Sequence, residues 1–65
     1  MTIEELRKRI RHIVNIRDDD EAAHGREDEL REDVLKAIAN GVENSQELAK
    51  EVLLTSDIEF SRWCA

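Results

Sequence analysis

The fold is decided by residues 2–16, which read TIEELRKRIRHIVNI. Thr2 and Glu5 match a capping box, in which each side chain satisfies a backbone N–H at the start of a helix. After this cap, apolar residues return every three or four positions and therefore share one helical face. These residues are Ile3, Leu6, Ile10, Ile13 and Val14. The pattern predicts a helix from about residue 3 to residue 16.

The next stretch predicts a second helix that ends at Gly41, a favourable residue just after a helix C-terminus. The aspartates at positions 18–20 can cap its start, because a helix N-terminus favours carboxylates. Its apolar stripe consists of Leu30, Val34, Ala37 and Ile38, with Leu35 on the flank. Gly25 costs about 1 kcal/mol relative to alanine in a helix. The helix therefore begins either at the aspartates or nearer Arg26.

Two more helices are predicted after Gly41. Asn44 with Glu47 repeats the capping pattern, and an apolar face runs to about residue 54. Its members are Leu48, Ala49, Val52 and Leu53. Ser56 with Glu59 opens a short final helix. Since no stretch alternates with period 2, the predicted fold class is all-α. We expect one domain, residues 1–65, built as a compact bundle of three to four short helices with a helix-turn-helix-like C-terminal half.

Charge is divided unevenly along the chain. Residues 1–17 hold five basic and two acidic side chains, whereas residues 18–33 hold two basic and nine acidic ones. Opposite charges on successive segments favour docking one on the other, within a protomer or between two. Arg7, Lys8 and Arg11 are the candidates for this electrostatic docking.

The small size of the domain predicts self-association. A chain of 65 residues supports a core worth only about 3–5 kcal/mol, so such domains are usually reinforced. A disulfide within the chain is excluded because Cys64 is the only cysteine. We therefore expect a homodimer. No apolar run approaches the length of a membrane span, and the start of the chain lacks the features of a signal peptide. We accordingly expect a cytoplasmic protein without a membrane partner.

No motif indicates an enzyme or a cofactor. The chain has only two glycines and no glycine-rich phosphate loop. Glu21 and His24 have the spacing of di-iron carboxylate bundles, and Asp28 lies on the same face. However, this segment is polar nearly all round, which favours a solvated helix start over a metal site. We predict no catalytic, cofactor-binding or metal-ligating residues.

The predicted helices and turn in residues 34–63 are spaced as in a helix-turn-helix, with Ser56 to Trp63 as the reading helix. This pattern suggests a DNA-binding transcriptional regulator as the alternative function. Asp57 and Glu59 make the reading helix net negative against Arg62. Because DNA phosphates repel a negative helix, nucleic acid is the less favoured partner.

The two aromatic residues, Phe60 and Trp63, lie close together near the end of the chain. They can cap the core of a small bundle, or they can anchor a partner together with Arg62. We favour the core, because a small domain has few large side chains to bury. Partner binding by Phe60, Arg62 and Trp63 stays open.

Three stretches resemble small uncharacterised all-helical proteins of bacteria and their phages and prophages. They are residues 21–30, EAAHGREDEL, residues 34–41, VLKAIANG, and residues 57–65, DIEFSRWCA. The resemblance implies a stand-alone accessory protein and supplies no catalytic residues. The sequence therefore predicts a small non-enzymatic accessory or regulatory protein that binds another protein, whose identity the sequence leaves open.

Overall fold

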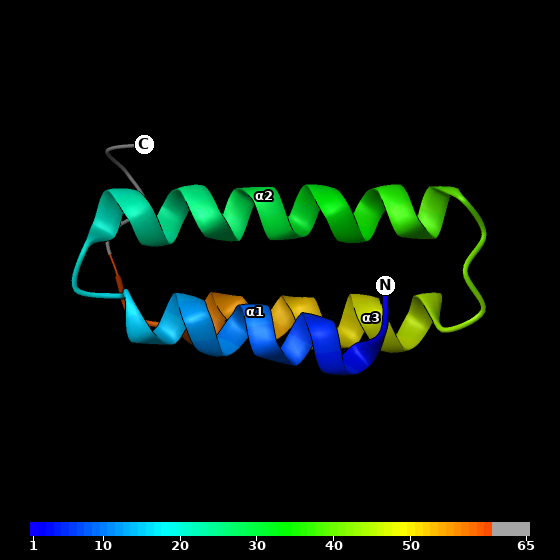
Figure 1. Cartoon of the computed structure of the whole chain (residues 1–65), viewed down its shortest axis with the longest axis horizontal. Helices are drawn as coiled ribbons and strands as arrows, with labels where there is room; N and C mark the ends of the chain where they lie inside the picture. The colour runs from blue at the N-terminus through cyan, green and yellow to red at the C-terminus, as the bar shows by residue number, and fades with distance from the viewer. Residues whose placement is uncertain (61–65) are drawn as a thin grey trace.

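The computed structural model describes residues 1–60, and this part of the chain is helical with no strand. Its elements are α1 (Ile3–Asn15), α2 (Asp20–Ala39), α3 (Ser45–Val52) and a short 3-10 helix, η1 (Leu53–Asp57). Figure 1 shows α2 along one side of the molecule and α1 and α3 along the other. The all-α prediction is confirmed.

The ends of α1 and α2 follow the predicted capping residues. The Thr2 Oγ1 accepts a hydrogen bond from the Glu5 backbone N–H at 3.1 Å. The Asp19 Oδ1 accepts one from the Ala22 backbone N–H at 3.2 Å. At the other end of α2, Gly41 has a positive φ of 81°, a conformation that glycine adopts without the steric cost of a Cβ. The sequence signals therefore set these boundaries.

The alternative start of α2 nearer Arg26 is wrong, because the helix begins at Asp20 and passes through Gly25. Ala23 is fully buried and Glu27 is buried beside it, so the first turns are attached to the core. This packing offsets the intrinsic cost of Gly25, which is exposed.

The predicted cap of α3 is also wrong. Asn44 precedes the helix but makes no capping hydrogen bond with its side chain. Its Nδ2 instead donates to the Met1 carbonyl at 3.4 Å. This hydrogen bond links the connection between α2 and α3 to the start of the chain. Met1 is distant in sequence from Asn44, so the spacing of nearby residues cannot reveal this partner.

The short final helix predicted from Ser56 is not present in the described residues. Ser56 lies inside η1, and the backbone leaves helical geometry at Ile58, where ψ is 124°. Thr55 explains part of this change, because its hydroxyl donates to the Val52 carbonyl at 2.9 Å. The remaining positions of that prediction, including Arg62 and Trp63, lie outside the described residues.

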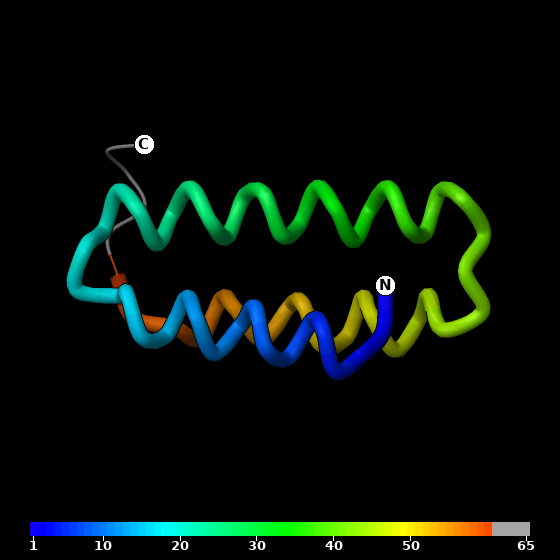
Figure 2. The backbone as a smooth tube through the Cα atoms, in the orientation of Figure 1, coloured from blue at the N-terminus to red at the C-terminus, as the bar shows by residue number. Residues whose placement is uncertain are grey.

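Each of the three α-helices packs on the other two. Figure 2 shows the connection 16–19 at one end of the molecule and the connection 40–44 at the other, so α2 runs antiparallel to α1 and α3. The buried apolar core draws on all three helices and comprises Leu6, Ile13, Ala23, Leu30, Val34, Leu48 and Val52. Every one of these except Ala23 lies on a predicted apolar face.

Candidate functional site

An apolar groove runs between α2 and α3 and has a volume of about 250 Å³. Its lining comes from both helices and from the start of η1: Arg31, Val34, Leu35, Ile38, Ala49, Val52 and Leu53. Arg31 is the only charged residue in this lining. The groove is therefore suited to apolar side chains.

Two leucines stand at the edges of this groove, which we call the α2–α3 groove. Leu35 on α2 is 66% exposed and Leu53 at the start of η1 is 65% exposed. A third exposed leucine, Leu54, is 51% exposed and does not line the groove. Single exposed leucines are common, but a contiguous apolar surface is typical of an interaction site.

Arg31 holds one end of the α2–α3 groove in place. Its Nη2 donates to Thr55 Oγ1 at 3.0 Å and to Ser56 Oγ at 2.9 Å. Its Nη1 lies 3.9 Å from Oε1 of Glu27, whose side chain is 1% exposed. These contacts fasten η1 to the middle of α2. The guanidinium is thus held on two sides, by η1 and by Glu27.

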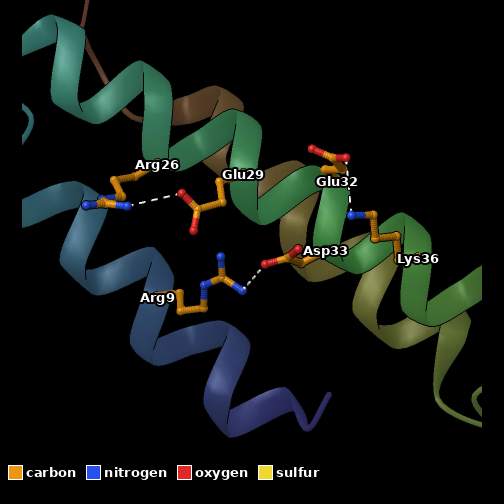
Figure 3. Close-up of polar contacts among 6 residues, drawn as sticks. All are labelled: Arg9, Arg26, Glu29, Glu32, Asp33 and Lys36. Carbon is orange, nitrogen blue, oxygen red and sulfur yellow. Dashed lines mark hydrogen bonds and ion pairs between the residues drawn. The ribbon is translucent and has the colours of Figure 1, made fainter.

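The basic residues of α1 make different contacts from those expected. Figure 3 shows Arg9 reaching from α1 to Asp33 on α2, where Nη1 and Oδ2 are 2.9 Å apart. Arg7 instead pairs with Glu51 of α3 at 3.3 Å. An ion pair between the basic and the acidic segment thus forms within the chain, through Arg9. Lys8 lines a shallow pocket beside Arg26, and Arg11 has no ion pair within residues 1–60.

The Arg7 ion pair has an electrostatic consequence. The hydrogen bond that Arg7 donates to the Glu51 carboxylate, together with the negative charge of that carboxylate, raises the pKa of the Arg7 guanidinium above its ordinary value. For a basic group, a raised pKa means that the charged form is stabilised, so the Glu51 carboxylate favours the cationic form of Arg7. Because Arg7 is exposed, this pair adds little to the stability of the fold.

Of the candidate partner-binding residues, only Phe60 is described. It is partly buried and packs against the core, as does Ile58. Arg62 and Trp63 lie outside the described residues. Phe60 thus contacts the core without being one of its buried residues, and the placement of Trp63 in the core stays a prediction.

The helical face with metal-ligand spacing holds a single contact. Nε2 of His24 lies 3.4 Å from Oδ2 of Asp28. Nδ1 of His24 is buried without a hydrogen-bond partner in residues 1–60. No group of three or more metal-ligating side chains comes together in this part of the chain.

Sequence reasoning missed the α2–α3 groove. Leu35 was placed on the flank of the apolar stripe, and Leu53 was placed on an apolar face, but neither was selected as a site residue. The only available signal was the position of Leu35 on the flank of its apolar stripe, since Leu53 belongs to a predicted apolar face. Recognising this requires the packing of α2 against α3, which spacing within one helix does not provide.

Comparisons with known proteins give no further guide. No protein-family model, curated protein or solved structure matches the chain. Among the helices of residues 1–60, none combines the length and apolar character needed to cross a membrane. The geometry of the α2–α3 groove therefore carries the functional argument.

Proposed function

We propose that this protein is a small non-enzymatic accessory or regulatory protein that acts in the cytoplasm by binding protein chains, and that it does so as a homodimer. The observation that carries this proposal is the α2–α3 groove with its two exposed leucines. In a chain of which 40% is charged, this surface offers apolar contacts in one place. Burial of such surface is the main driving force of protein association.

The rest of the described chain agrees with this proposal. The charged side chains that come together form ion pairs within the bundle, among them Arg9 with Asp33 and Arg7 with Glu51. These pairs join helices to one another and are explained by the fold. The groove leucines have no such role, because more than half of each side chain is exposed.

The test is affinity capture of the full chain from its native cell, with and without nuclease, followed by mass spectrometry. We expect a protein partner that is retained after nuclease treatment and lost with Leu35→Glu. Leu54→Glu is the matched control, because Leu54 is also exposed but lies outside the groove lining. Equal capture by all three proteins would contradict a role for the groove, and capture that disappears with nuclease would favour nucleic acid.

The alternative, a DNA-binding transcriptional regulator with a helix-turn-helix, has less support. It needs a reading helix from Ser56, and the described part of that segment carries Asp57 and Glu59. Residues 18–65 contain five basic and fourteen acidic side chains, a net charge of −9. Phosphate contacts dominate DNA affinity, so this charge opposes binding.

We therefore predict no specific binding to duplex DNA at physiological salt. The measurement is a gel-shift selection from random duplexes. Enrichment of one sequence motif, with loss of binding on Arg62→Ala, would reverse the ranking of the two functions.

A further inference from the structure

We infer that the pocket between α1 and α2 is a binding site for the phosphate group of a small soluble molecule. This pocket, which we call the α1–α2 pocket, has a volume of about 270 Å³. Its lining consists of Lys8, Arg9, His12, Ile13 and Arg26. It shares no residue with the lining of the α2–α3 groove, so the inference goes beyond the proposed function.

Every ionisable side chain that lines the α1–α2 pocket is basic. The chain as a whole has a net charge of −6, so the lining is opposite in sign to the molecule that carries it. Lys8 and His12 are exposed, and neither side chain makes a hydrogen bond or an ion pair within residues 1–60. Their donors are therefore available to an anion in the pocket.

The two arginines of the lining are held in place and retain further donors. Nη1 of Arg9 lies 2.9 Å from Oδ2 of Asp33. Nη1 of Arg26 lies 3.1 Å from Oε2 of Glu29, and Figure 3 shows both ion pairs. A guanidinium has five N–H donors, and each of these ion pairs uses one nitrogen. Within residues 1–60 the two guanidiniums make no other hydrogen bond, so an anion can accept from them without breaking either pair.

The donors of the α1–α2 pocket fit a phosphate group better than a carboxylate. A carboxylate has two oxygens in one plane, and a single guanidinium matches both of them. A phosphate group has three acceptor oxygens that point in different directions, and its charge is about −1.5 to −2 at neutral pH. The lining supplies donors from two helices, with Lys8 and His12 on α1 and Arg26 on α2. Several oxygens of one phosphate group can therefore be bound at once.

The surroundings of the α1–α2 pocket favour a compact anion over an extended one. The carboxylates of Asp33 and Glu29 lie beside the pocket, because they pair with its two arginines. Nucleic acid or an anionic membrane would bring further phosphates towards these carboxylates, and like charges repel. The volume of about 270 Å³ is also close to the lower limit of ligand sites, which is about 300 Å³. Both observations indicate a small ligand.

The experiment is an NMR titration of the full chain, labelled with ¹⁵N, with inorganic phosphate and with sodium chloride at equal ionic strength. We expect phosphate to give saturable shifts of the amide signals of residues 8–13 and of Arg26, and chloride to give none. Lys8→Gln and Arg26→Gln should each weaken phosphate binding by about threefold to tenfold, because each removes a charge-assisted donor.

Arg11→Gln is the matched control for these substitutions. Arg11 is an exposed basic residue of the same helix and does not line the pocket. Its removal should change the affinity for phosphate by less than about twofold, since salt screens charges that do not contact the ligand. The amide spectrum of each variant also shows whether the fold is retained. Equal binding of phosphate by the original chain and all three variants would overturn the site.

A second arm separates a soluble phosphate from a lipid headgroup. The probe is a vesicle of phosphatidylcholine and phosphatidic acid, which presents the same chemical group on a membrane. We expect the chain to stay in the supernatant when the vesicles are sedimented. Sedimentation with the vesicles that is lost with Lys8→Gln would overturn the assignment to a soluble ligand and would assign the pocket to a membrane surface.

Discussion

At the scale of single residues, Thr55 joins η1 to the rest of the bundle. Its side chain is fully buried, accepts a hydrogen bond from Arg31 and donates one to the Val52 carbonyl. The hydroxyl therefore stabilises the 3-10 turn and holds the Arg31 guanidinium at the same time. Two elements depend on one oxygen atom.

We predict that Thr55→Val lowers the free energy of unfolding by about 1–3 kcal/mol, because the isosteric methyl group removes both hydrogen bonds of a buried hydroxyl, the one that it accepts from Arg31 and the one that it donates to the Val52 carbonyl. Urea denaturation followed by circular dichroism measures the change. Ser56→Ala is the control, since Ser56 accepts from the same Arg31 atom but is exposed, and it should cost under about 0.5 kcal/mol. Equal effects of the two substitutions would show that burial of the Thr55 oxygen is not what matters.

At the scale of helices and turns, the two glycines differ in backbone conformation, since Gly25 is helical and Gly41 has a positive φ. Gly25 lies in the second turn of α2, with no atom within 4 Å of the position that a Cβ would take. Gly41 has equally open surroundings, but its φ of +81° is one that other residues rarely adopt. The comparison separates helix propensity from backbone strain, because neither site has a steric neighbour.

We expect Gly25→Ala to stabilise the protein by about 0.5–1 kcal/mol, since alanine loses less backbone entropy in a helix. Gly41→Ala should destabilise it by about 1–2 kcal/mol, because the left-handed conformation is unfavourable for a residue with a Cβ. Thermal unfolding of both variants at one protein concentration makes the comparison. A lower midpoint for Gly25→Ala would contradict the explanation that Gly25 destabilises α2 through its backbone entropy.

The sequence was sufficient for α1 and for the end of α2, because Thr2 and Gly41 act through neighbouring backbone atoms. It was insufficient where the deciding contact is long-range. Asn44 turns to the Met1 carbonyl, and Ser56 accepts from Arg31, so both matched a local capping pattern and served another purpose. Glu27 illustrates the same limit, since a glutamate on a polar segment gives no local sign that it will be buried.

At the scale of the whole molecule, the candidate site depends on how α2 and α3 meet. The apolar faces of both helices were predicted, and Leu30, Val34, Leu48 and Val52 are buried as those faces require. The groove arises from the residues at the margins of these faces. Their exposure depends on the angle and spacing between the helices, which no pattern within one helix specifies.

Assembly is the prediction that belongs to this scale. The buried core contains seven apolar residues, two of which are a small alanine and a valine that is slightly exposed. We expect a homodimer at micromolar concentration, so the thermal midpoint should rise with protein concentration by mass action. Calorimetry across a hundredfold range of concentration measures this. A midpoint that is independent of concentration, together with a monomer in sedimentation, would contradict it.

The shortness of the two connections, residues 16–19 and 40–44, also bears on the rate at which the chain folds. Neighbours along the sequence become neighbours in space, and topologies dominated by such local contacts reach the native state within microseconds to milliseconds. In the proposed homodimer, the encounter of two copies is bimolecular and slows on dilution. In a stopped-flow experiment, the helical signal should therefore recover at a rate that is the same at every concentration. A slower phase, accelerated in proportion to the amount of protein, should report pairing alone.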